Sequence, residues 1–167
     1  MGGICLLLTT GEALADLHGF ILGAFFLLAY SGGLASLFAL RIEWEKPTGV
    51  AMLIRQIKIG TVLMAVIIWL TVITGTYIVY PLYRAQYQQV LSITAWNTFA
   101  MAWKMHLGWI SPMLATAVAY VVIRYRSQLA GEARIRQTLE VLFTAAFAAA
   151  GVAGILGAFV TKVLPVH

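Results

Sequence analysis

Charged residues are scarce in this chain. Only 10% of its 167 residues are charged, whereas 62% are hydrophobic. A soluble globule of this size needs more polar surface, so we expect lipid to cover much of the protein. The formal net charge is +5, but the basic residues do not form a face with aromatic side chains beside it. We therefore expect no nucleic-acid partner.

The residues that several kinds of chemistry require are also missing. Cys5 is the only cysteine, which excludes an intramolecular disulfide and a thiolate metal cage. There is no glycine-rich phosphate loop, no HExxH, no Ser-His-Asp set and no pair of carboxylates within the apolar runs, so hydrolytic and nucleotide-driven chemistry lack their residues. No internal repeat suggests a secondary transporter. The first ten residues lack a basic region, so we expect no removable signal peptide.

Long hydrophobic runs dominate what is present. Crossing a hydrocarbon core of about 30 Å takes about 20 apolar residues as helix. Four stretches are long enough, at about 14–40, 57–80, 93–123 and 139–164. The connections between them are short, which makes consecutive helices antiparallel neighbours. The sequence therefore predicts an all-α membrane protein, an up-down four-transmembrane-helix bundle that forms a single integral-membrane domain over residues 1–167.

The basic residues predict the orientation of this bundle. Eight of the eleven lie in two segments that separate apolar runs, namely Arg41, Lys46, Arg55, Lys58 and then Arg124, Arg126, Arg134, Arg136. Under the positive-inside rule both segments face the cytoplasm, and there they also attract anionic lipid headgroups. Both termini and the loop at 81–92, which carries Arg84, then face the outer, periplasmic side. We expect the plasma membrane of a bacterium or an archaeon.

Small residues predict where helices meet. Gly19 and Gly23 form a GxxxG pair in the first span, and Ala150, Gly154 and Ala158 follow the same spacing in the fourth. Such stripes let helix backbones approach closely. They suit packing inside the bundle, a helix of another subunit, or a flat cofactor, and the sequence does not choose among these.

Two histidines lie within the predicted spans, where an ionisable side chain is costly and usually functional. His18 follows the helix cap expected at Thr9 by nine residues, about 13 Å along the axis, and His106 follows a cap at Thr94 by twelve, about 18 Å. Both helices run inward from the outer side. The two imidazoles are therefore expected at a similar depth, about one turn apart.

This geometry suits a b-type haem held between two spans, with His18 and His106 as axial ligands of the iron. On the first span His18 is followed by Gly19 and shares a face with Gly11, Leu14, Ala15, Leu22 and Phe25. On the third span His106 shares a face with Phe99, Ala102, Trp103, Ile110 and Met113. Both faces suit a porphyrin, and both suit an ordinary core. Quinone contact, a proton path or a structural hydrogen bond are the alternatives for the histidines.

Two basic residues complete the expected site. Lys104 lies in the same span as His106, and Arg84 lies in the expected outer loop. Either side chain is able to pair with a haem propionate or another carboxylate. Lys104 is also long enough to snorkel to the outer surface, which requires no ligand.

In architecture the chain resembles the small four-helix membrane cytochrome b subunits of respiratory complexes. The resemblance covers all four spans and rests on the number of spans, a histidine in each of two spans, the glycine after His18 and the basic residue Arg84 in the outer loop. Those subunits often hold two haems through four histidines. The two span histidines of this chain allow one haem, or leave the cofactors to neighbouring subunits.

The sequence thus predicts an electron-transfer subunit of a respiratory or photosynthetic redox complex rather than an independent enzyme. It is expected to bind one haem b near the outer face and to exchange electrons with quinol or a partner cytochrome. Its expected partners are other membrane subunits, lipid and quinone. The alternative is a structural subunit without a cofactor, which scaffolds such a complex.

Overall fold

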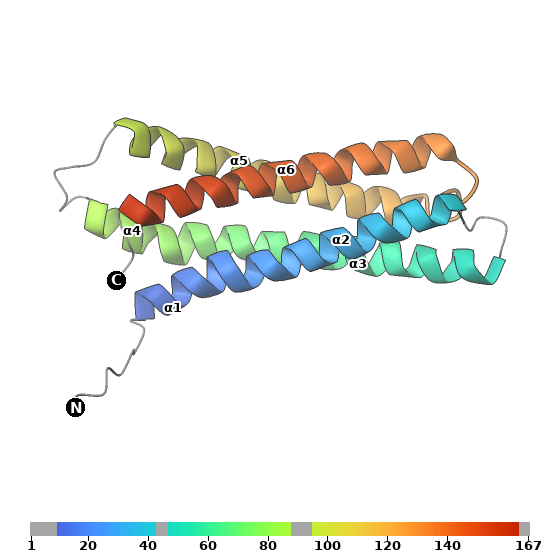
Figure 1. Ribbon diagram of the computed structural model, residues 1–167, viewed down its shortest axis with the longest axis horizontal. Coiled ribbons are helices and arrows are strands. Elements are labelled where there is room, and N and C mark those ends of the chain that lie inside the picture. The colour runs from blue at the N-terminus through green and yellow to red at the C-terminus, as the bar shows by residue number, and fades with distance from the viewer. Residues whose placement is uncertain (1–9, 43–46, 88–94, 164–167) are drawn as a thin grey trace, which may run out of the picture.

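A computed structural model describes residues 10–42, 47–87 and 95–163, and over these residues it contains helices and turns but no strand. The helices form four long antiparallel rods (Figure 1). The first rod is α1 (Thr10–Asp16), the π-helical η1 (Leu17–Ile21) and α2 (Leu22–Ile42), and the second is α3 (Pro47–Thr74), the π-helical η2 (Gly75–Val79) and α4 (Tyr80–Tyr87). The third is α5 (Ala95–Arg124) and the fourth is α6 (Ala133–Val163).

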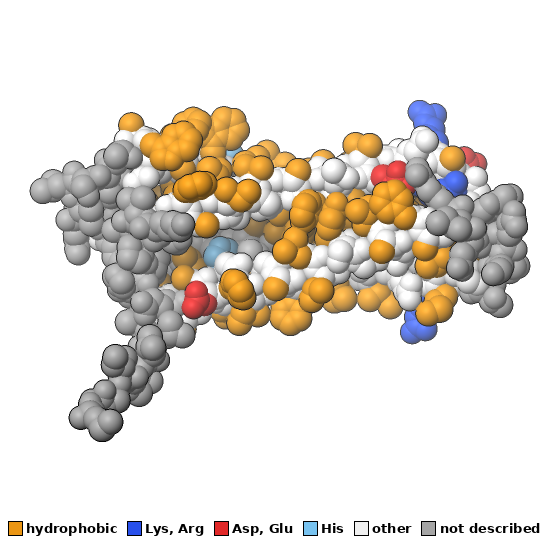
Figure 2. Space-filling model, in the orientation of Figure 1, with side chains coloured by type: hydrophobic (Ala, Val, Ile, Leu, Met, Phe, Trp, Pro, Cys, Tyr) orange, Lys and Arg blue, Asp and Glu red, His pale blue; other side chains and the backbone are white. Residues whose placement is uncertain are grey.

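Each rod contains a segment long and apolar enough to cross a membrane. These segments are Ala13–Leu40, Gly49–Ala85, Ala95–Arg124 and Ala133–Val160. Hydrophobic surface extends along the length of the face drawn in Figure 2, as expected where lipid is the solvent. An all-helical fold with four helices long and apolar enough to span a membrane is confirmed for the described residues, and it indicates an integral membrane protein.

Consecutive rods are neighbours, as the short connections predict. Helix α2 packs mainly on α3, α5 packs mainly on α6, and α3 contacts α5 where the two hairpins meet. Helix α2 also contacts α6. The first and third rods therefore lie diagonally across the bundle, and the first rod begins at the end where the fourth rod ends (Figure 1).

The helices extend further than the apolar runs suggest. Helix α3 begins at Pro47 rather than at residue 57, so Arg55 and Lys58 are exposed on a helix and not in a loop. Proline suits a first helical position because its fixed φ is already helical, and arginine and lysine are good helix formers. Lys46 lies outside the described residues. At the same end of the bundle α6 begins at Ala133, so Arg134 and Arg136, which precede residue 139, are also on a helix.

The second rod also continues past the point where an outer loop was expected. Pro81 follows the π-helical η2 and lies inside α4, so Arg84 is exposed on a helix. Pro81 has no N–H for the carbonyl one turn before it, and a wider π turn at that place tolerates the missing hydrogen bond. The loop expected at 81–92 is thus helical up to Tyr87.

The core consists of two separate hydrophobic clusters. The larger surrounds Phe143, which is fully buried, and includes Phe26 of α2, Met64 of α3 and Val118 of α5. The smaller one lies toward the end where α1 begins and consists of Tyr83, Ala100 and Val160, with Ala15, Tyr80, Leu82, Met101 and Leu156 packed against it.

Close helix contacts occur at other small residues than those predicted. A Cβ added to Gly60 of α3 would lie 3.2 Å from the Cα of Gly33 of α2, so these two backbones nearly touch. By contrast, a Cβ at Gly19, Gly23 or Gly154 would meet no atom within 4 Å among the described residues. Gly19, Gly23 and Gly154 therefore do not mark contacts inside this bundle, whereas Ala150 of the same stripe packs against the larger cluster.

The end of the bundle where α3 and α6 begin carries most of the basic residues, and we call it the basic end. There Arg136 joins the turn after α5 to helix α6. Nη1 of Arg136 donates hydrogen bonds to the carbonyl oxygens of Leu129 and Ala130, at 2.9 and 2.6 Å. These bonds tie the turn after α5 to the first turns of α6, where such carbonyls lack helical partners. Among the described residues visible on the face drawn in Figure 2, Lys and Arg side chains appear at this end.

Candidate functional site

The imidazole of His18 is held on the second rod. Its Nδ1 lies 3.2 Å from Oγ1 of Thr74. The Thr74 hydroxyl donates its proton to a backbone carbonyl, that of Leu70 at 2.8 Å. Where the hydroxyl proton goes to that carbonyl, Nδ1–H of His18 donates to Oγ1 of Thr74, and the lone pair of a neutral imidazole is then on Nε2.

Gly75 provides the space that this imidazole occupies. A Cβ added to Gly75 would lie 2.5 Å from Cε1 of His18 and 2.9 Å from its Nε2. Real Cβ atoms essentially never come so close to another heavy atom, so only glycine fits beneath the ring. His18 itself is partly buried. Thr74 and Gly75 thus form the contact surface for His18 on the second rod.

Lys104 reaches the same part of the bundle from the third rod. Its side chain is partly buried and lies over Gly157 of α6, where an added Cβ would be 3.0 Å from Nζ and 3.2 Å from Cε. Lys104 is therefore packed on α6 inside the bundle.

His18, Thr74, Gly75 and Lys104 lie between the two hydrophobic clusters, and Gly157, which Lys104 contacts, borders the small cluster. In the chain His18 falls between Ala15 of the small cluster and Phe26 of the large one, and Lys104 falls between Met101 and Ala115 in the same way. Two π-helical segments lie in this region, since η1 contains His18 and η2 begins at Gly75. Single π turns inside α-helices occur often at functional sites. We call His18, Thr74, Gly75, Lys104 and Gly157 the polar site.

His106 lies outside this site. Its Nδ1 is 2.7 Å from the carbonyl oxygen of Ala102, one turn earlier in α5, and its side chain is exposed. The carbonyl only accepts, so Nδ1–H donates and the lone pair of a neutral ring is again on Nε2. All the residues that share its predicted face are exposed as well, namely Phe99, Ala102, Trp103, Ile110 and Met113.

This exposed face is aromatic over the part of α5 that precedes His106. The rings of Trp96 and Phe99 stack with centroids 5.5 Å apart, and those of Phe99 and Trp103 lie 5.9 Å apart. About half of the Trp103 surface is exposed. In a membrane this face contacts lipid or a neighbouring subunit, so Trp103 does not line the bundle interior.

The structure therefore separates the two predicted haem ligands. Lys104 and His106 are two positions apart on one helix, about 200° around the axis, so they point to opposite sides. Lys104 packs inward on α6, which turns His106 outward. His18 is partly buried against the second rod, whereas His106 is exposed on α5. A haem ligated by both residues therefore stays a prediction.

The remaining predicted site residues are not brought to the polar site. Gly19 is exposed with no atom within 4 Å of an added Cβ, and Arg84 is exposed on α4. Within the described residues no group of three or more His, Cys, Asp and Glu side chains is arranged to hold a metal ion.

Thr74, Gly75 and Gly157 were missed as site residues. The only signal for the first two is a hydroxyl residue followed by glycine within a long apolar run. Gly157 lies among the many small residues of the fourth span, and nothing in the sequence distinguishes it from Gly154.

Comparisons of the chain with protein-family models, with curated proteins and with solved structures found no match.

Proposed function

We propose that this protein is an integral-membrane subunit of a redox complex, and that its polar site binds the head group of a quinone or quinol. The observation that carries the proposal is that His18 and Lys104, on different rods, are both partly buried between the two hydrophobic clusters, and that each packs on a glycine of another rod. Ionisable groups in a membrane interior are costly, and they commonly mark substrate or proton pathways.

The two side chains match the chemistry of this ligand. A quinone has carbonyl oxygens that accept hydrogen bonds, and an N–H of Lys104 is a donor for one of them. A quinol has hydroxyl groups, and the Nε2 lone pair of His18 is an acceptor for one of them. When a quinol gives two electrons to a redox centre of a neighbouring subunit it also releases two protons; the Nε2 lone pair of His18 would accept one, and the other would pass to water at the membrane surface.

Quinone retained by the purified chain tests this proposal. Protein extracted in mild detergent from quinone-containing membranes is expected to carry quinone, measured by solvent extraction and chromatography. His18→Ala and Lys104→Met are each expected to lower the quinone content about tenfold, since each removes a buried hydrogen bond to the ligand.

Two variants serve as controls. Lys58→Met removes an exposed lysine at the opposite end, and His106→Ala removes the outward imidazole. Both are expected to keep the quinone. A wild-type protein without quinone, or equal losses in all four variants, would contradict the proposal.

A haem between His18 and His106 is the second candidate function. One observation favours it: in both residues Nδ1 is bonded to a protein oxygen, and this leaves Nε2 for a metal, as in most ligating histidines. A bound haem b would supply one-electron transfer. A reduced-minus-oxidised spectrum of the wild-type protein tests it, and either His18→Ala or His106→Ala is expected to abolish the low-spin signal.

The His106→Ala variant separates the two candidates, because it removes a haem ligand but leaves the polar site intact. If the protein carries neither quinone nor haem, the structural subunit without a cofactor is the better description.

A further inference from the structure

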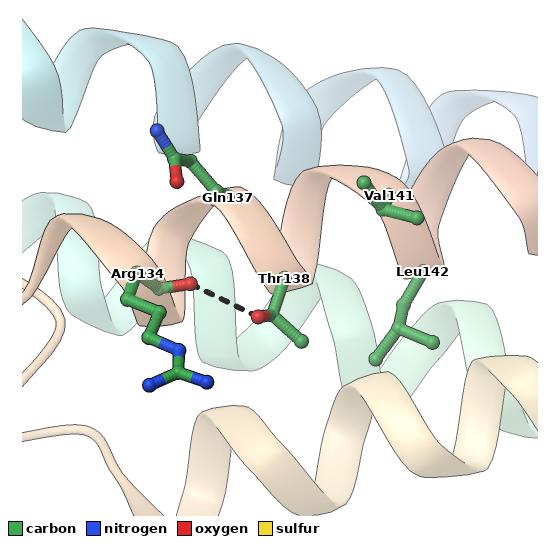
Figure 3. A pocket seen from close by; sticks show the side chains of 5 residues that line it. All are labelled: Arg134, Gln137, Thr138, Val141 and Leu142. Atoms are coloured by element: carbon green, nitrogen blue, oxygen red, sulfur yellow. Dashed lines mark hydrogen bonds between the residues drawn. The ribbon is translucent and has the colours of Figure 1, made fainter.

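A hollow opens beside the first turns of α6, at the basic end of the bundle. It has a volume of about 310 Å³ and is lined by Arg134, Gln137, Thr138, Val141 and Leu142 of α6 (Figure 3). A second hollow of about 220 Å³ shares Arg134 and Thr138 with it and adds Ile135 of α6 and Val121 and Tyr125 of α5. Together the two form a groove beside the first turns of α6, which we call the α6 groove.

The polarity of the groove changes along its length. Arg134 lies at its start, and Thr138 and Leu142 follow on the same side of α6 (Figure 3). The Thr138 hydroxyl donates to the carbonyl oxygen of Arg134 at 3.0 Å, so it presents its oxygen and methyl group to the groove. From Arg134 to Leu142 the helix rises about 12 Å. The groove thus begins at the guanidinium of Arg134 and continues along the apolar side chains of Val141 and Leu142, within the apolar segment Ala133–Val160.

The charge near this groove favours an anion. The segment from Arg124 to Arg136 contains four arginines and one acid, Glu132. Nη1 of Arg136 is engaged with backbone carbonyls, whereas Arg134 lines the groove. A guanidinium binds two phosphate oxygens at once, which gives it geometric preference for phosphodiesters.

We propose that the α6 groove binds an anionic phospholipid, with its phosphate on Arg134 and one acyl chain along Val141 and Leu142. A free phosphate would leave the apolar walls of the groove uncovered, whereas an acyl chain buries them. Basic pockets between helices at the membrane surface are known to hold lipid head groups of this kind. This site is independent of the polar site at the other end.

Native mass spectrometry of the full chain in detergent tests the assignment. Phosphatidylglycerol and phosphatidylcholine with identical acyl chains are added separately, and the fraction of protein with one bound lipid is measured. We expect phosphatidylglycerol to be retained about five times more than phosphatidylcholine. Arg134→Gln is expected to remove this preference, and Thr138→Trp, which fills the groove but keeps every charge, is expected to lower the binding of both lipids.

Arg126→Gln is the matched control, because Arg126 is an exposed arginine of the same segment that does not line the groove. It is expected to keep the preference within twofold. Equal loss in Arg126→Gln and Arg134→Gln would show that diffuse charge attracts the lipid and would overturn the site. Displacement of the lipid by an equal concentration of glycerol 3-phosphate would also overturn it, since the apolar walls would then contribute nothing. Circular dichroism of each variant verifies folding, and Thr138→Trp tests the groove if Arg134→Gln does not fold.

Discussion

At the scale of single residues, two glycines provide the space for the partly buried side chains of His18 and Lys104. Gly75 leaves room for the imidazole of His18, and Gly157 leaves room for Nζ and Cε of Lys104. The histidine was foreseeable from the sequence as an ionisable group inside a span. The position of Gly75 beneath the ring was not foreseeable, because the sequence of an apolar helix does not show whether a glycine faces a side chain, a backbone or lipid.

Gly75→Ala is therefore expected to displace His18. The added methyl group would overlap the ring, and overpacking of this kind costs about 1 to 3 kcal/mol. Thermal unfolding in detergent micelles should show the loss of stability, and quinone content should fall with it.

Gly151→Ala is the matched control, since a Cβ there would meet no described atom within 4 Å. It is expected to be neutral or to stabilise the helix by up to about 1 kcal/mol, because alanine is the better helix former. Equal unfolding temperatures for the two variants would refute the steric argument.

At the scale of helices, which side of each helix faces inward was the hardest property to predict. Helix α5 is apolar on every side, as a membrane helix must be, so its periodicity does not indicate which side faces the bundle. Fixed contacts set the rotation instead: Ser111 donates a buried hydrogen bond to the carbonyl oxygen of Ala146 of α6, at 3.0 Å. This is why His106 and Trp103, expected inside the bundle, are exposed.

The same reasoning applies to small residues and gives a prediction for two glycines. Gly60→Leu is expected to destabilise the protein by more than about 2 kcal/mol, because the side chain must fit where α2 and α3 backbones nearly touch. Gly154→Leu faces open space and is expected to leave unfolding of the isolated chain unchanged, since leucine is favourable in lipid. Unfolding in micelles compares the two.

Blue-native electrophoresis of membranes then asks whether Gly154 contacts another subunit. If the stripe receives a partner helix, Gly154→Leu dissociates a larger complex while the isolated chain stays stable. An unchanged complex would show that the stripe faces lipid alone.

At the scale of the whole molecule, the prediction from sequence was most successful. Hydropathy and the length needed to cross a bilayer fix four helices, and short connections fix their order, since neither depends on side-chain detail. The ends of the helices were less predictable. Basic residues near the membrane surface suit a helix as well as a loop, so Arg55 and Lys58 extend α3.

The orientation across the membrane remains a prediction from the basic residues. In a Cys5→Ser background, we expect Arg84→Cys to react with a membrane-impermeant maleimide in intact cells, because α4 lies at the outer end. Gln128→Cys, in the turn between α5 and α6, should react only after the membrane is opened. The reverse pattern would invert the topology.

The two π-helical segments change which residues share a helical face along the first and second rods. A π turn contains one residue more than an α turn, so it rotates everything beyond it by about 100° relative to an uninterrupted helix. In each rod, one continuous helical wheel therefore does not describe the residues on both sides of the π-helical segment, η1 or η2. Deleting one residue from either segment is expected to restore a regular helix and to turn the two parts of that rod by about 100° relative to each other, which would take His18 and Gly75 out of register.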